Sequence, residues 1–148
     1  MNRCQLENFI EESNLIEGIK GPPDPLEVEA YTEFLNSPRP DLDMVCHLNK
    51  VIQPDAELRS HPGMNVRVGD YIAPIGGPDI RTRLRELVWN MNTGVFPPWR
   101  IYVDFEVLHP FTDGNGRTGR ALWLYAMKCE APLGFLQHFH YQTLEQQG

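Results

Sequence analysis

The sequence predicts a mainly α fold, a compact bundle of helices that carries one small β-hairpin. Apolar residues recur at three-four spacing in several segments, which is typical of helices with one buried face. The best strand candidate is VRVGDYIAP, residues 66–74, where apolar and polar residues alternate before a possible tight turn. The 13 prolines mark loops, so the elements between them are expected to be short.

The first helix is predicted over residues 5–17. One face of this helix would carry Leu6, Phe9, Ile10, Ser13 and Glu17. Gly18 follows at a position where helices commonly end. Because the apolar residues of this face must point toward the protein, the Glu17 carboxylate is expected to point there too.

Two further helices are predicted in the first half of the chain. Asp24 can cap the second helix, Pro25 suits its first position, and Glu27 completes a capping-box pattern. This helix is expected to end near Asn36, and the third spans about 42–52. The stretch QPDAELRSHPG that follows is interpreted as a loop.

The second half of the chain begins with the hairpin, which Gly69-Asp70 would turn. Helices are then expected over about 79–91, after Pro97-Pro98 as far as His109, from about Gly116 or Arg117, and in the C-terminal FLQHFHYQTLE. Pro110 disfavours a helical residue before it, so the helix must end near His109. The loop TDGNG therefore lies between two helices.

Composition and charge exclude several functional classes. A chain of 148 residues fits one domain, and a net charge of -7 argues against generic nucleic-acid binding. Three cysteines without a CxxC pair argue against a disulfide framework or a zinc site. We find neither a signal peptide nor an apolar run of about 18 residues, so the expected location is cytoplasmic, away from membranes.

The stretch HPFTDGNGRTGR, residues 109–120, predicts a phosphate site. Glycines beside an asparagine let backbone amides converge at a helix N-terminus, which attracts anions. Arg117 and Arg120 lie three apart, and guanidinium groups suit a polyphosphate. Asp113 would repel that ligand unless a divalent cation such as Mg²⁺ bridges them. His109 precedes the loop and can accept a proton near neutral pH.

This stretch resembles the signature of the Fic domain family, HxFx(D/E)GNGRxxR. Every defined position is matched, by His109, Phe111, Asp113, Gly114, Asn115, Gly116, Arg117 and Arg120. PGMNVRVGDYIAP resembles the flap of the family. The resemblance covers about residues 60–145. We therefore expect residues 1–148 to form a single Fic domain. Gly116 argues against the Doc-like variant, in which lysine replaces this glycine and the transfer becomes kinase-like.

The resemblance implies transfer of AMP from ATP to a hydroxyl of a target protein. His109 would be the base, and Asp113 would hold Mg²⁺ against the phosphates. Gly114, Asn115 and Gly116 would cradle the phosphates, with the Asn115 side chain near the α-phosphate, while Arg117 and Arg120 would contact the phosphate chain and the γ-phosphate. The flap, Val66, Arg67, Val68, Gly69, Asp70 and Tyr71, would dock the target by strand pairing. Tyr141 resembles a tyrosine that lies near the adenine.

SNLIEG, residues 13–18, resembles the family's inhibitory motif (S/T)xxxE(G/N). The resemblance implies that residues 1–20 contain an inhibitory helix, and that Ser13 and Glu17 are its inhibitory residues. Glu17 would pair with Arg120, so that ATP binds in an unproductive pose. The same glutamate could assist removal of AMP from the target, and the sequence does not separate these two roles.

Two alternatives stay open at this point. The loop is expected to bind a phosphate chain and does not recognise a base, so UMP or another nucleotide-linked phosphate could be the transferred group. The protein could instead be a non-catalytic nucleotide-binding regulator, although His109 counts against that reading. The target protein is unknown, and the sequence leaves open a homo-oligomer.

Overall fold

The structure of the protein is a computed structural model, and it describes residues 1–130. It confirms the predicted mainly α fold, with six helices and one antiparallel hairpin in that part of the chain. The elements in chain order are α1 (Arg3–Ile16), α2 (Pro25–Asn36), α3 (Leu42–Ile52), β1 (Arg67–Val68), β2 (Tyr71–Ile72), α4 (Pro78–Thr93), α5 (Pro98–Leu108) and α6 (Asn115–Ala126). The predicted C-terminal helix lies outside the described residues.

Local sequence explains how α2 begins. The Asp24 carboxylate caps the helix by accepting a hydrogen bond of 2.8 Å from the Leu26 N–H, and Pro25 takes the first helical position. Glu27, the expected partner in a capping box, binds elsewhere. Its Oε2 accepts a hydrogen bond of 3.1 Å from Nδ2 of Asn14, so this acid ties α2 to α1.

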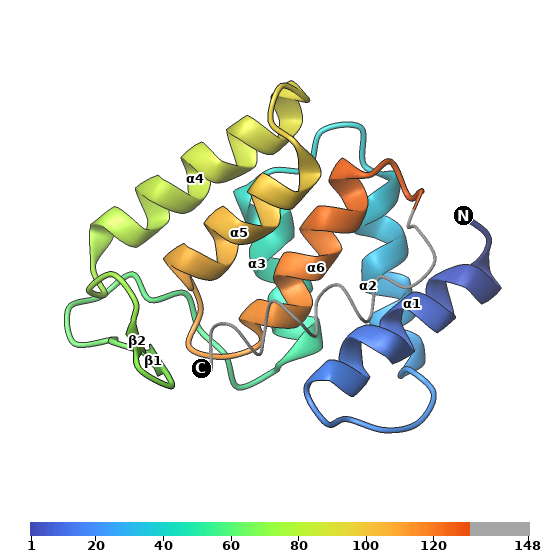
Figure 1. Cartoon of the computed structure of the whole chain (residues 1–148), viewed down its shortest axis with the longest axis horizontal. Helices are drawn as coiled ribbons and strands as arrows, with labels where there is room; N and C mark the ends of the chain where they lie inside the picture. The colour runs from blue at the N-terminus through green and yellow to red at the C-terminus, as the bar shows by residue number, and fades with distance from the viewer. Residues whose placement is uncertain (131–148) are drawn as a thin grey trace.

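Helix α6 is the centre of the bundle. It contacts each of the other five helices of the described chain, and Figure 1 shows it between α5 on one side and α2 on the other. Its buried residues include the apolar Ala121, Leu122 and Leu124, which pack in one continuous core with the other helices. An amphipathic surface helix would turn a polar face to solvent, whereas α6 is buried along most of its length. The polar residues near its N-terminus therefore lie inside the protein.

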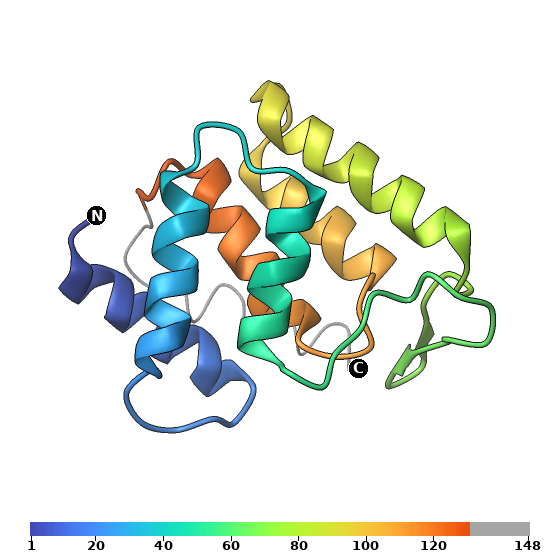
Figure 2. The same cartoon turned by 180° about the vertical axis from the view of Figure 1, so that it is seen from behind.

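The N-terminal end of α6, the C-terminal end of α5, the hairpin and the C-terminal end of α1 meet at one end of the molecule (Figures 1 and 2). In the hairpin, Arg67 pairs with Ile72 and Val68 with Tyr71, which confirms the predicted turn. A single β-bridge joins Leu58 to Phe111. The segment before the hairpin is therefore fixed to the loop between α5 and α6.

None of the helices in residues 1–130 combines the length and the apolar character that a bilayer span requires. The cysteines, Cys4, Cys46 and Cys129, are all free thiols. Free thiols fit the odd number of cysteines and the absence of a CxxC pair.

Candidate functional site

The loop between α5 and α6 is closed by the side chain of Asn115. Its Oδ1 accepts a hydrogen bond of 2.9 Å from the Phe111 N–H, and its Nδ2 donates one of 2.7 Å to the Phe111 carbonyl. The amide is buried, so these bonds satisfy groups that water cannot reach. Both polar atoms of this side chain thus bind the backbone of its own loop, and its expected position near the α-phosphate stays a prediction.

The N-terminal end of α6 offers backbone N–H groups to a ligand. Gly114 caps the helix in the left-handed conformation, with φ of 74°, and no side chain caps α6. A Cβ on this glycine would lie 3.0 Å from Nδ2 of Asn49 and from Cβ of Gln53, so the turn excludes larger residues. The N–H groups of the first turn have no acceptor within the helix, and the helix dipole is positive there. This end of α6 is thus built for an anion.

His109 ends α5 in the left-handed conformation, with φ of 49°. Its Nδ1 lies 3.1 Å from the carbonyl oxygen of Glu106. A carbonyl only accepts, so Nδ1 carries the hydrogen and Nε2 keeps the lone pair. Burial lowers the pKa of His109 below its usual range, so the ring is neutral at pH 7 and Nε2 can accept a proton.

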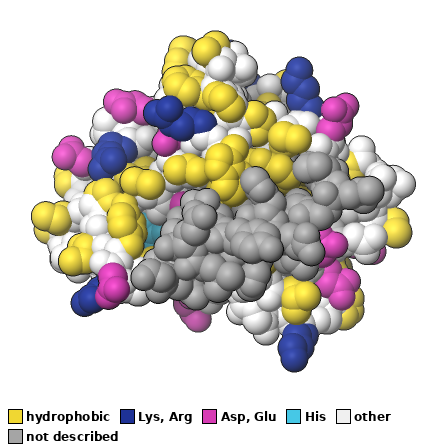
Figure 3. Space-filling model, viewed as in Figure 1, with side chains coloured by type: hydrophobic (Ala, Val, Ile, Leu, Met, Phe, Trp, Pro, Cys, Tyr) yellow, Lys and Arg dark blue, Asp and Glu magenta, His cyan; other side chains and the backbone are white. Residues whose placement is uncertain are grey.

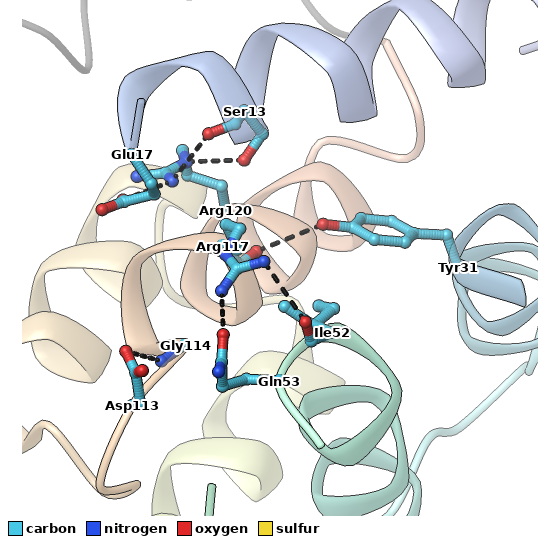
Figure 4. Close-up of polar contacts among 9 residues, drawn as sticks. All are labelled: Ser13, Glu17, Tyr31, Ile52, Gln53, Asp113, Gly114, Arg117 and Arg120. Atoms are coloured by element: carbon cyan, nitrogen blue, oxygen red, sulfur yellow. Dashed lines mark hydrogen bonds and ion pairs between the residues drawn. The ribbon is translucent and has the colours of Figure 1, made fainter. Parts of the chain in front are cut away.

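Arg120 points toward α1 (Figure 4). Its Nε donates to Oγ of Ser13 at 2.7 Å, and its Nη2 donates to the Ser13 carbonyl at 3.1 Å and to Oε1 of Glu17 at 2.8 Å. Ser13 thus lies on the inward face of α1, and Glu17, which caps the C-terminal end of this helix, points to the same arginine, as the helix pattern predicts. The guanidinium is buried while the Glu17 side chain is partly exposed, so the ion pair sits at the boundary between core and solvent.

Arg117 points toward α3 and away from Arg120 (Figure 4). Its Nη2 donates to Oε1 of Gln53 at 2.7 Å, and its Nη1 donates to the Ile52 carbonyl at 3.2 Å. These acceptors lie at the C-terminal end of α3, where a cation is favourable. The two arginines therefore do not form a pair, although residues three apart share a helix face, because their long side chains bend in opposite directions.

These groups surround one hollow of about 550 Å³. Its lining comprises Glu17, Ile19, Gln53, Val66, Arg67, Val68, Tyr102, Glu106, His109, Thr112, Asp113, Gly114, Asn115, Gly116, Arg117 and Arg120. A separate hollow of about 350 Å³ between α3 and α4 contains no residue of the HPFTDGNGRTGR stretch. The sequence-predicted catalytic and phosphate-binding residues therefore line the larger hollow together with Glu17, while Ser13 lies outside its lining and contacts Arg120.

Asp113 is the residue of this hollow that could hold a metal ion. Its carboxylate is exposed, and one oxygen accepts a hydrogen bond of 2.8 Å from the Gly114 N–H. Residues 1–130 contain no cluster of three or more His, Cys, Asp or Glu side chains that could bind a metal. A single carboxylate fits Mg²⁺ that is shared with the phosphates of a ligand, which is how proteins commonly bind this ion.

The comparison with protein families agrees with this geometry. Residues 98–127 match the model of the Fic/DOC family. This stretch, called the Fic/DOC segment, is similar to that family over these residues. It contains α5, the loop and α6, and the general chemistry of the family is transfer of nucleotide-linked phosphate groups. No curated protein matches the chain. The roles of α1 and of the hairpin, which lie outside the Fic/DOC segment, stay predictions.

Sequence reasoning missed Glu106 within the Fic/DOC segment. Its side chain is 9 % exposed, its Oε1 has no hydrogen-bond partner among the described residues, and burial raises its pKa to about 7. It also lines a neighbouring apolar hollow of about 280 Å³ together with His109. The spacing could have indicated this burial, because Glu106 lies four residues after Tyr102 and beside Phe105, on the face of α5 that these residues bury.

Sequence reasoning also missed Arg59, which lies in the stretch interpreted as a loop. Its side chain is fully buried and donates to backbone carbonyls, so no sequence pattern could have indicated its partners.

The hairpin lies at the mouth of the larger hollow. Val66, Arg67 and Val68 line that hollow, and Tyr71 lines the neighbouring one. The Tyr71 hydroxyl donates a hydrogen bond to the Val107 carbonyl, which holds the hairpin against α5. Tyr141, the residue expected near adenine, lies outside the described residues.

Proposed function

We propose that this protein transfers AMP from ATP to a Ser, Thr or Tyr hydroxyl of a target protein, and that Glu17 inhibits this transfer. The observation that supports the proposal best is the convergence of His109, the N-terminal end of α6 and Arg120 on one hollow. A neutral base, an anion site and a buried cation are the groups that a phosphate transfer requires.

The triphosphate would bind along the N-terminal end of α6. Backbone N–H groups from Asn115 to Arg117 would hold phosphate oxygens, and the helix dipole would add to their attraction. Arg120 would hold the γ-phosphate once its guanidinium is released by Glu17. Asp113 would hold Mg²⁺, which supplies neutralisation of the phosphate charge when it is bound.

His109 would act on the hydroxyl of the target. Its Nδ1–H is held by the Glu106 carbonyl, so Nε2 would take the hydroxyl proton. The target oxygen would then form a bond to the α-phosphorus of ATP while the bond to the bridging oxygen breaks. Pyrophosphate would leave with the electron pair of that bond, and the target would carry AMP. The protein contributes position and charge, and no covalent intermediate is needed.

The hairpin would place the target near His109. Its strands are two residues long, and Ile72 beside Tyr71 is 71 % exposed. Figure 3 shows hydrophobic side chains gathered on the face that α4, α5 and the hairpin share in Figure 1. An extended target segment could pair with the backbone of the hairpin and cover such side chains.

The test is labelling of protein from ATP that carries the label on its α-phosphate. We expect the Glu17→Gly protein to become labelled or to label a partner, with a mass increase of one adenylyl group. The Glu17→Gly/His109→Ala protein should bind ATP and remain unlabelled. Labelling from UTP in preference to ATP would assign another nucleotide, and ATP binding without any labelling by Glu17→Gly would support a regulator.

A further inference from the structure

Arg59 is a buried arginine that has no acidic partner among the described residues. Its side chain is 0 % exposed, and no ion pair of the described residues includes it. An unpaired buried charge is costly, so a chain retains one only where its hydrogen bonds are well satisfied. The contacts of Arg59 therefore indicate what it does.

Within the described residues, all side-chain hydrogen bonds of Arg59 go to backbone carbonyls. Nε donates to the carbonyl of His109 at 2.6 Å, and Nη2 donates to that of Leu108 at 2.9 Å. These two acceptors are the C-terminal end of α5, which carries partial negative charge. The guanidinium thus fixes the backbone on which the predicted base is mounted, and the left-handed conformation of His109 needs such support.

The other two bonds hold the hairpin at both of its ends. Nη1 donates to the Met64 carbonyl, before β1, at 3.1 Å, and to the Pro74 carbonyl, after β2, at 2.7 Å. The backbone of Arg59 adds to this, because its N–H donates to the Pro110 carbonyl at 2.9 Å and its own carbonyl accepts from Gly77 at 3.0 Å.

We propose that Arg59 is a positioning residue that fixes the target-docking hairpin relative to the imidazole of His109. The inference rests on the proposed function, since it assigns the hairpin to target docking and His109 to proton transfer. A planar guanidinium with five donors can span the four carbonyls in fixed directions, whereas a lysine ammonium has three donors and no fixed plane. The charge alone is therefore insufficient, and Arg59→Lys is the informative change.

The experiment uses the full chain in the Glu17→Gly background. We expect Arg59→Lys to lower the rate of self-labelling by about 10²-fold, as a displacement of about 1 Å between reacting groups does. ATP affinity should change by less than about twofold, because no hydrogen bond of Arg59 within the described residues goes to α6. Arg100→Lys is the matched control, since Arg100 is exposed on α5 and, within residues 1–130, pairs only with Asp104; it should label at the parent rate.

A second variant tests the same link without a buried charge. Tyr71→Phe removes the bond from the hairpin to the Val107 carbonyl at an exposed site, and should slow labelling in the same direction by a smaller factor. Labelling by Arg59→Lys at the parent rate, or an equal loss of labelling and of ATP affinity, would overturn the inference.

A structural readout separates the failure of this inference from failure of the proposed function. In Arg59→Lys, amide hydrogen exchange should accelerate across residues 64–76 and the His109 ring resonances should shift, while α6 exchange stays unchanged. These changes do not depend on activity. If they occur in a protein whose Glu17→Gly parent never labels, the link stands and the proposed function fails. If exchange across residues 64–76 is unaltered, the link itself is refuted.

Discussion

Oε1 of Glu17 lies 2.8 Å from Nη2 of Arg120, with the glutamate side chain 42 % exposed and the arginine side chain 1 % exposed. The two partners thus differ in exposure, because water solvates part of the carboxylate, while Glu17 and the surrounding residues keep water from the guanidinium. Release of Glu17 leaves a buried cation that another anion can neutralise. Under the proposed function, a γ-phosphate at this position would replace the carboxylate, and the contact would then be a switch between two anions.

Ser13 strengthens the docking of α1 on Arg120, so Ser13→Ala should loosen it. The change deprives the buried Nε of its acceptor at 2.7 Å and should lower the free energy of unfolding by about 1–3 kcal/mol. We also expect self-labelling to rise above that of the unaltered protein, because a looser α1 carries Glu17 with it. Chemical unfolding and labelling measure the two effects, with Ser37→Ala as the control. Lower labelling with unchanged stability would contradict this account.

Asn115→Ala should destabilise the protein. It removes both bonds to the Phe111 backbone and leaves buried polar groups without partners, at a cost of about 2–3 kcal/mol. Thermal and chemical unfolding measure the loss, and the exposed Asn36 supplies the control Asn36→Ala. Intact stability with lost ATP affinity would instead place the Asn115 amide on the phosphates.

Glu106 should make stability depend on pH. Its pKa is raised to about 7 in the folded protein, so between about pH 4.5 and 7 the folded state keeps a proton that the unfolded state releases. Stability from this group is therefore present at low pH and lost as the pH rises through 7. Relative to the unaltered protein, Glu106→Gln should gain about 2 kcal/mol between pH 5 and pH 8. A constant difference across that range, from urea unfolding at several pH values, would contradict the raised pKa.

His109 should set the acidic limit of the reaction. Burial lowers its pKa below the ordinary value of 6.5, so the neutral ring persists to lower pH than in a solvated histidine. In the Glu17→Gly background, the labelling rate should hold as the pH falls to 6.5 and decline only below it. Titration of the His109 ring resonances by NMR should give the same midpoint. A midpoint at or above 6.5 in either experiment would refute this assignment.

The helices could be predicted because their sequences carry local signals. The third helix was expected over 42–52 and is Leu42–Ile52, and Asp24 caps α2 as its sequence position indicates. The Gly69-Asp70 turn likewise needs only neighbouring residues. Boundaries differed by a residue or two at the ends, as in α4, which begins at Pro78 and extends to Thr93 before the left-handed Gly94.

The site was harder to predict, because its geometry depends on contacts between distant segments. The pattern placed Glu17 on the inward face of α1, and the ion pair with Arg120 followed from the resemblance of SNLIEG to the inhibitory motif. The sequence pattern could not show that the Arg117 side chain turns to the end of α3, since its acceptor, the Ile52 carbonyl, lies 65 residues away in the chain. Arg59 was missed for the same reason, because backbone carbonyls of folded segments are its partners.

The central claim is that Glu17 holds Arg120 away from a nucleotide. The most direct measurement compares incorporation of α-labelled AMP by the unaltered protein, by Glu17→Gln and by Glu11→Gln, which removes the same charge from an exposed site on α1. The account predicts strong labelling by Glu17→Gln alone, because only that change frees the guanidinium for the γ-phosphate. Equal labelling by all three proteins would contradict it.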